Sequence, residues 1–188
     1  MSFRNHIRKF WVAIITILTV AAAAGGYSFY WAEVLHKFTT VTENKVYRSM
    51  AMPLDSLKKT LLTHDINTVI DLRNAVDGAV IESERRLVES LGKQYYNVPS
   101  NQIPKPETIS SFVEILDRED TYPVLIHCKH GEGRAVLFSA IYRIEYEGWN
   151  GNDARSACRI ITWESAFDSS APKGKYLNEY VSRSQKTK

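Results

Sequence analysis

The chain has 188 residues, 44% of them hydrophobic, and a formal net charge of +3 at neutral pH. This length and composition suit one folded domain with a hydrophobic core of its own. The excess charge comes from three basic residues among the first nine, and the remaining 21 basic and 21 acidic residues cancel. A nucleic-acid-binding protein normally carries a basic face or stripe, so we expect no nucleic-acid partner. Two cysteines without zinc-binding spacing also predict neither a disulfide framework nor a zinc site.

An uncharged stretch of 22 residues at 10–31 is long enough to cross a bilayer as a helix. Basic residues precede it and balanced charges follow it, so the positive-inside rule places the following chain outside the cytoplasm. The same residues fit a cleavable signal peptide, with an apolar core at 10–20 and small residues at 21–24. We expect a membrane anchor or uncleaved signal segment at 1–31, because the aromatic residues at 27–31 suit a membrane interface. A buried helix of a soluble protein is the remaining interpretation.

The folded domain is predicted to follow a connector at residues 32–44 and to occupy residues 45–188. Leucines at helical spacing after Pro53 predict its first helix. Residues 66–73 are β-branched and apolar, which is typical of a buried strand. Residues 79–91 carry enough Glu, Arg and Leu for an exposed helix that the next glycine ends.

The second half of the domain continues to alternate between strands and helices. Residues 94–98 predict a strand, and residues 107–117 predict a helix with one apolar face. Residues 123–126 form a short apolar strand. The helix predicted at 134–146 has apolar residues over most of its surface, so it should lie at the centre of the domain.

Two more helices complete the predicted elements. The first should be capped by Asn152 or Asp153 and run through Thr162, and the second should cover residues 173–182. Strands that alternate with helices predict an α/β fold. We therefore expect a single domain with a central, mostly parallel sheet flanked by helices, preceded by an N-terminal hydrophobic helix.

Cys128 lies at the end of the apolar strand that begins at residue 123, six residues before the helix at 134–146 begins. A loop that contains glycine and leads into a helix N-terminus directs backbone N–H groups at an anion. Gly131 and Gly133 permit the close approach that this requires. A helix N-terminus and nearby cations also favour a thiolate, and they can lower a cysteine pKa from about 8.5 to roughly 3.5. A thiolate beneath a bound phosphate can transfer a phosphoryl group through a covalent intermediate.

Five residues separate Cys128 from Arg134, which is the Cys-x5-Arg spacing of protein tyrosine phosphatases and dual-specificity phosphatases. The segment "HCKHGEGR" resembles their phosphate loop, and "VYRS" at 46–49 and "INTVIDLR" at 66–73 are similar to the start of that domain. The likeness extends over about 140 residues and is greatest to exported bacterial dual-specificity phosphatases and to atypical plant and fungal ones. The resemblance implies an enzyme, a phosphoric monoester hydrolase.

By position, the resemblance implies that Cys128 attacks phosphorus and that Arg134 binds the phosphate and stabilises the transition state. His127 would favour the thiolate from behind. No metal and no cofactor would be needed. The phosphate-binding residues would be Lys129, His130, Gly131, Glu132, Gly133 and Arg134.

Several of these polar residues also have a purely structural interpretation. His127 can equally be a hydrogen-bonded histidine of the core. Asp71 and Arg73 most simply make structural hydrogen bonds at a strand end. Cys158 lies in a predicted helix among small and apolar residues and is expected only to pack.

Two departures from the family pattern concern the second reaction step and the general acid. The residue after the loop arginine is normally Ser or Thr, but here it is Ala135. The family supplies an Asp from the loop that corresponds to residues 99–107, and that loop contains none. The general acid is therefore unknown. Glu107 and Glu132 are weak candidates, and Glu107 also suits the first turn of the next helix.

We therefore expect a membrane-anchored or exported phosphatase that hydrolyses phosphate monoesters, phosphotyrosine above all, through a cysteinyl-phosphate intermediate. Its partners would be a phosphorylated protein or a small phosphate ester, and the membrane through the N-terminal helix. The expected location is the bacterial inner membrane with the catalytic domain in the periplasm, or the periplasm after cleavage. The main alternative is a pseudophosphatase that recognises phosphorylated partners with little turnover. Sulfur transfer and arsenate reduction would also suit a cysteine loop ahead of an arginine.

Overall fold

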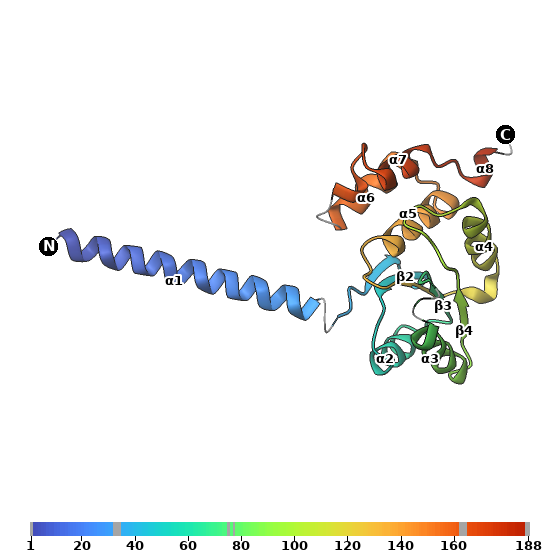
Figure 1. The fold of residues 1–188 in the computed structure, drawn as a ribbon, viewed down its shortest axis with the longest axis horizontal. Helices are drawn as coiled ribbons and strands as arrows, with labels where there is room; N and C mark the ends of the chain where they lie inside the picture. Colours follow the sequence, from blue (N-terminus) through green and yellow to red (C-terminus); the bar gives the residue numbers. More distant parts are fainter. Residues whose placement is uncertain (1, 32–34, 75, 77, 162–164, 187–188) are drawn as a thin grey trace. The chain divides into compact units, whose positions relative to one another are not determined.

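The structure, a computed structural model, describes residues 2–31, 35–74, 76, 78–161 and 165–186. Its contacts divide the chain into two compact units, Met1–Lys37 and Phe38–Lys188 (Figure 1). The start of the expected connector (32–34), the expected helix end at Thr162 and the last two residues of the expected domain lie outside the described residues.

The first unit contains one long helix, α1 (Ser2–Phe29). Its segment Ile7–Phe29 is long and apolar enough to cross a membrane, and none of that stretch is buried. The hydroxyls of Thr16 and Thr19 donate to the carbonyls of Val12 and Ile15 at 2.8 Å, so these two polar side chains are satisfied within the helix. By length and composition, this helix fits a membrane anchor or a signal segment.

The second unit is built on a five-stranded sheet in the order β1-β2-β5-β3-β4. Four strands run parallel: β2 (Val46–Met50), β5 (Val124–Cys128), β3 (Thr68–Asp71) and β4 (Gln94–Asn97). The edge strand β1 (Thr39–Thr42) pairs antiparallel with β2. This confirms the predicted α/β domain with a mostly parallel sheet. β1 lies inside the segment expected to be a connector, so part of that segment belongs to the sheet.

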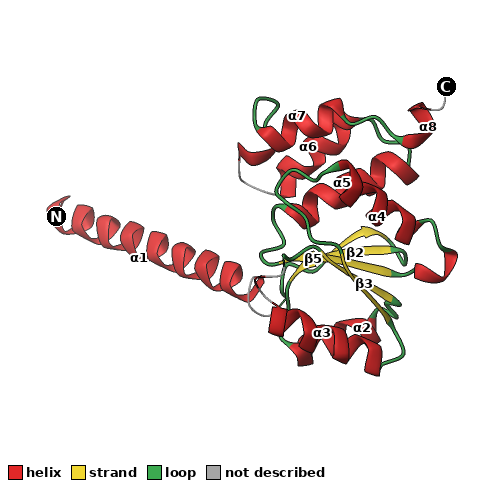
Figure 2. Ribbon diagram, turned by 45° about the vertical axis from the view of Figure 1, so that its right-hand side comes forward, coloured by secondary structure: helices red, strands yellow, loops and turns green. Residues whose placement is uncertain are grey.

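Helices cover both faces of this sheet (Figure 2). α2 (Leu54–Thr63) and α3 (Gly78–Ser90) lie on one face, and α4 (Pro106–Leu116) and α5 (Arg134–Tyr146) lie on the other. α6 (Gly151–Ile161) and α7 (Pro172–Glu179) pack beyond α5, and the short α8 (Arg183–Lys186) follows. Because both faces are covered, the strands are buried on both sides and read as continuous apolar runs.

The larger core cluster lies between the sheet and α5, as its apolar surface predicted. Nine of the residues of α5 are buried, and Phe138 contacts Phe112 of α4 edge to face at 4.9 Å between ring centroids. A second cluster fills the space between the sheet and the α2–α3 layer. The residues of β5 alternate between the two clusters, with Leu125 facing α2 and α3 and Cys128 facing α5.

Three sequence expectations on local structure were wrong. The cap of α6 is Asn150, whose side-chain oxygen accepts from the Asp153 N–H at 2.9 Å, rather than Asn152 or Asp153. The helix expected at 173–182 ends at Glu179, and α8 follows it. α3 is not simply an exposed helix, because its Glu84 is only 2% exposed.

Candidate active site

The candidate site lies where β5 ends and α5 begins. Cys128 is the last residue of β5, and its carbonyl accepts from the Ala51 N–H at 2.8 Å beyond the neighbouring β2. Arg134 is the first residue of α5, with Gly133 as its N-cap. The five residues between them therefore form the expected loop from the carboxyl end of a central strand to a helix N-terminus, which is suited to bind an anion.

Gly131 shapes this loop because no other residue fits its position. It has a φ of +71°, and a Cβ there would lie 2.7 Å from the backbone nitrogen of Met50. Its carbonyl accepts a hydrogen bond from Nη1 of Arg48 at 3.1 Å, and Arg48 itself is only 2% exposed. Burial lowers the pKa of Arg48. A buried arginine on β2 thus holds the middle of the phosphate loop.

The side chain of Arg134 is fixed by two other loops. Its Nη1 donates to the carbonyl of Leu72 at 2.6 Å, after β3, and to that of Ser100 at 3.2 Å, after β4. Since both bonds use Nη1, Nε and Nη2 can serve the two oxygens of a phosphate in a bidentate contact. The guanidinium is held ready for an anion before one binds.

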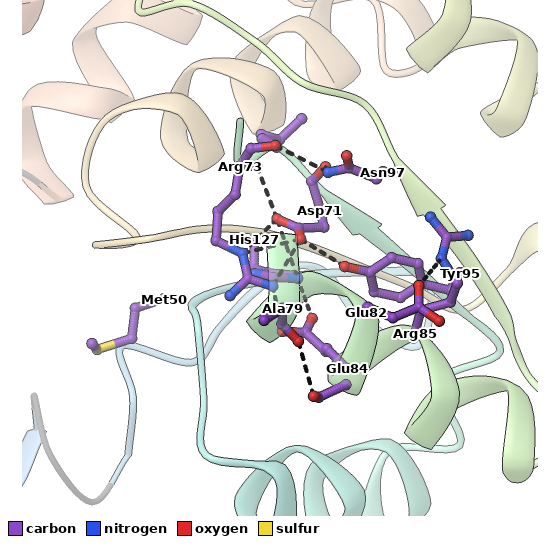
Figure 3. A network of polar contacts seen from close by, with 12 residues as sticks. Met50, Asp71, Arg73, Ala79, Glu82, Glu84, Arg85, Tyr95, Asn97 and His127 are labelled. Carbon is purple, nitrogen blue, oxygen red and sulfur yellow. Dashed lines mark hydrogen bonds and ion pairs between the residues drawn. The ribbon is translucent and has the colours of Figure 1, made fainter. Parts of the chain in front are cut away.

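A buried charge cluster lies behind the loop and consists of Asp71, Arg73, Glu84, Tyr95 and His127 (Figure 3). Arg73 bonds both oxygens of Asp71 at 2.8–3.0 Å and Oε2 of Glu84 at 2.5 Å. Tyr95 donates to Asp71 at 2.6 Å. Nε2 of His127 lies 2.7 Å from Oε1 of Glu84 and 3.8 Å from Oδ1 of Asp71. The structural hydrogen bonds expected of Asp71 and Arg73 are confirmed.

The pKa values in this cluster follow from its charges. Burial raises the pKa of Asp71, but the charge of His127 and the hydrogen bonds from Arg73 and Tyr95 outweigh it and hold that pKa below its usual range. Burial opposes the charge of Arg73, but its bonds to Asp71 and Glu84 raise its pKa. Burial, followed by the nearby carboxylates, raises the pKa of Tyr95, so its phenol stays protonated as a donor.

The same cluster meets a geometric criterion for metal binding. One ligand atom each from Asp71, Glu84 and His127 lies within 4.8 Å of the others. However, the guanidinium of Arg73 already binds both carboxylates, and a divalent cation would add charge beside it. We therefore assign no metal to these residues.

The two carboxylate candidates for the general acid occupy different places. Glu107 is in the first turn of α4, where it complements the helix dipole, as its sequence position indicated. It lines a pocket of about 230 Å³ with Asn97, Pro99 and Ser111, and no residue of the phosphate loop lines that pocket. Glu132 lies half-buried within the phosphate loop. Of the two, only Glu132 is part of the loop that would hold the phosphate.

Two polar side chains that the sequence did not indicate reach the phosphate loop. A Cβ at Gly133 would lie 2.9 Å from Nζ of Lys173 and 3.0 Å from Oε1 of Gln102. Gln102 belongs to the loop after β4, where the family carries its acid, so an amide approaches the site there. Lys173 comes from the N-terminus of α7. No local pattern could have found it, because Lys173 lies 40 positions after Gly133, the loop residue that it approaches.

The second cysteine lies outside the loop between β5 and α5. Cys158 is 3% exposed in α6, and burial raises its pKa to about 12. Its sulfur lies 4.0 Å from the carbonyl oxygen of Val136. Its burial in α6 fits the expectation that Cys158 packs there.

Comparisons with known proteins give matches over most of this chain. The family model described as "DSP-PTPase phosphatase fused to NAD+ Kinase" matches residues 31–170. The dual specificity protein phosphatase TpbA of Pseudomonas aeruginosa is 39% identical over 51 residues, which are 27% of this chain and 23% of TpbA. The matched sequence thus spans less than a quarter of that curated relative.

Solved structures share the fold at low sequence identity. The core catalytic domain of the PP-IP phosphatase SIW14 from S. cerevisiae, in complex with citrate, has a TM-score of 0.59 at 16% identity, covering 77% of this chain and 85% of that one. P. aeruginosa TpbA has a TM-score of 0.56 at 22% identity, covering 73% and 81%. TpbA in complex with pTyr has a TM-score of 0.50 at 20% identity, covering 74% and 91%.

Proposed function

Because the chain belongs to the DSP-PTPase phosphatase family, we propose that it hydrolyses phosphate monoesters through a phosphocysteine formed on Cys128. One observation carries this proposal. Cys128 ends a central parallel strand directly before a glycine loop and a helix N-terminus, and the Arg134 side chain is held at that loop by the backbone of two others. In this proposal, the nucleophile Cys128, the loop N–H groups that bind the anion and the guanidinium of Arg134 all lie at the same loop.

In the first step, the Cys128 thiolate attacks phosphorus. An S–P bond forms while the ester P–O bond breaks, and the alcohol or phenol leaves. The loop N–H groups and Arg134 bind the oxygens on which charge develops, and because they are already fixed they need little reorganisation during the reaction.

In the second step, water attacks the phosphocysteine. The S–P bond breaks, inorganic phosphate leaves and the thiolate returns. Ala135 is completely buried at the start of α5 and has no hydroxyl to offer the departing sulfur. The hydroxyl of Ser139, one turn further on, donates to the carbonyl of Ala135 at 2.7 Å and cannot replace it. We therefore expect this step to limit turnover.

Phosphotyrosine is the substrate class that we propose. A phenol with a pKa near 10 leaves more easily as an anion than an alkyl alcohol does, which matters where an amide, Gln102, takes the place of a general acid. The complex of the relative TpbA with pTyr supports the same class. Phosphorylated proteins and small aryl phosphates are the corresponding partners.

We also propose that the catalytic domain works outside the cytoplasm, in the periplasm of a bacterium, with residues 1–31 as membrane anchor or signal segment. The apolar stretch of α1 and the basic residues in its first turns support this arrangement. In this proposal residues 32–44 connect that segment to a phosphatase domain at 45–188, although β1 already belongs to the sheet.

A pseudophosphatase is the second candidate, since a missing hydroxyl at Ala135 and an amide at Gln102 would slow turnover and would leave the phosphate loop itself in place. The test compares the purified protein with Cys128→Ser on an aryl phosphate. We expect steady release of phenol and phosphate from the wild type and none from the variant. Tight phosphate binding without release of phenol by the wild type would favour the pseudophosphatase, and equal release from both proteins would contradict Cys128 as nucleophile.

A further inference from the structure

The side chains of His127 and Cys128 lie on opposite faces of the sheet. Along β5, Leu125 packs in the cluster beneath α2 and α3, whereas Ile126 and Cys128 pack against α5. Because successive side chains of a strand alternate, His127 faces the α3 side. There it meets Glu84, which α3 directs back into the protein (Figure 3).

The short contact between these two side chains indicates which nitrogen of His127 carries a proton. Nε2 of His127 lies 2.7 Å from Oε1 of Glu84, and both side chains are 2% exposed. Among the described residues, Oε1 of Glu84 and both ring nitrogens of His127 make no hydrogen bond of regular geometry, so the contact is an ion pair by its distance, and Oε2 of Glu84 is the oxygen that Arg73 bonds. A nitrogen lone pair facing a carboxylate oxygen at this distance would be repulsive, so Nε2 carries a proton.

The charges of the buried charge cluster require a second ring proton as well. Asp71 and Glu84 bring two negative charges and Arg73 brings one positive charge, all at most 3% exposed. A buried charge without a counter-charge is costly. An imidazolium at His127 makes the cluster neutral, and a neutral imidazole leaves one negative charge unbalanced.

The other groups that face His127 do not supply this charge. The residue opposite it on β2 is Ser49, and the one opposite it on β3 is Asp71. β4 contributes the phenol of Tyr95, and the described residues of α2 in this cluster, Leu57 and Leu61, are apolar. Arg48 of β2 bonds the carbonyl of Gly131 instead, and Arg85 of α3 lies over the ring of Tyr95 and pairs with Glu82 and Glu89. Among the described residues of these elements, His127 is therefore the group placed to balance the second carboxylate.

We propose that Glu84 is a positioning residue for the nucleophile: it holds His127 as an imidazolium, and the adjacent positive charge favours the thiolate of Cys128. The inference rests on the proposed role of Cys128 as nucleophile. Glu84 acts through His127 and contacts neither substrate nor sulfur. The other oxygen of the same carboxylate accepts a hydrogen bond from Arg73. Glu84 of α3 therefore links Arg73, which follows β3, to His127 of β5.

The protonation of His127 can be measured without turnover. In protein labelled with ¹⁵N-histidine, both ring nitrogens of His127 should show the shifts of a doubly protonated ring at pH 7. A neutral ring in the wild type would overturn the proposal, whether or not any variant folds. Activity does not enter this readout, so a failure of the proposed phosphatase function would appear separately, in the Cys128→Ser comparison.

The variant Glu84→Gln tests the cause, and Glu82→Gln is its matched control on the exposed side of the same helix, where Glu82 pairs with Arg86. Glu84→Gln should leave His127 neutral at pH 7, and Glu82→Gln should not change it. The midpoint pH for alkylation of Cys128 by iodoacetamide, followed on its own peptide, should rise by about 1 unit in Glu84→Gln only. A folded Glu84→Gln variant with an unchanged His127 ring or an unchanged midpoint would overturn the proposal.

Discussion

At the scale of single residues, the site depends on side chains whose charge or hydrogen bond has no substitute nearby. Gly131 is required by its backbone angle and by the nearby backbone of Met50. Glu84 and His127 share a contact whose charges are buried. Ala135 is different, because what matters there is a hydroxyl that the family carries and this chain lacks.

Replacing Ala135 by serine should therefore raise the steady-state rate. A hydrogen bond to a charged group is worth about 1.5–3 kcal/mol, or roughly ten- to a hundredfold in rate. In stopped-flow experiments with an aryl phosphate, the wild type should release a burst of phenol close to one equivalent per enzyme. Ala135→Ser should shrink the burst and raise kcat. The control is Ala140→Ser, which adds a hydroxyl at another buried position of α5. A wild type without a burst, and a serine variant that is no faster, would contradict a rate-limiting second step.

At the scale of elements, the loop between β5 and α5 is held from three directions. Arg48 of β2 holds its middle, and Arg134 ties its end to the loops after β3 and β4. These contacts join segments separated by 83 and 62 residues. Preorganisation of the phosphate site is therefore a property of the whole sheet rather than of the loop sequence.

Arg48→Met should loosen the phosphate loop, because the buried carbonyl of Gly131 then loses its donor. An unsatisfied buried polar group costs about 1–3 kcal/mol, so the thermal midpoint should fall and the Kd for inorganic phosphate should rise by about tenfold. Arg86→Met is the control, since Arg86 is 77% exposed. Calorimetry and thermal unfolding measure both effects. Phosphate binding equal to that of the wild type would show that Arg48 does not hold the loop.

The loop at 99–107 makes a prediction about substrates. With Gln102 beside the phosphate loop and Glu107 in a separate pocket, phosphotyrosine should be cleaved much faster than phosphoserine. The acidic limb of the kcat pH profile should be weak, and Glu107→Gln should change kcat by less than about twofold. Initial rates on matched peptides measure this. Equal rates on both esters, or a large loss in Glu107→Gln, would reveal a general acid.

At the scale of the whole molecule, the chain combines an apolar N-terminal helix with an α/β phosphatase domain. The basic residues at the start of α1 predict that the domain is exported. A reporter that is active only after export, fused after Lys188 of the full chain and expressed in a bacterium, should be active. The control removes the positive charges by replacing Arg4, Arg8 and Lys9 with glutamine, which should reduce export. Activity of a reporter that works only in the cytoplasm would contradict this topology.

The sequence by itself determined the elements and the chemistry of the loop. The period of the apolar residues predicted α5 and β3, and the Cys-x5-Arg spacing predicted the phosphate loop. Each of these signals lies within a short stretch of the sequence, so it can be read without the fold. It also indicated the apolar α1 and the missing hydroxyl at Ala135. Each of these depends on residues close together in sequence.

Only the tertiary structure decided which distant residues complete the site. Glu84 read as a solvated residue of an exposed helix, since charged residues are rarely buried without partners. Its partners, Arg73 and His127, come from two different strand ends, and no local pattern predicts which side chain closes such a cluster. The same holds for Arg48 and Lys173, which reach the loop from β2 and α7. Burial and charge balance are properties of the packed fold, so the residues that support the nucleophile appear only when the sheet and its helices are assembled.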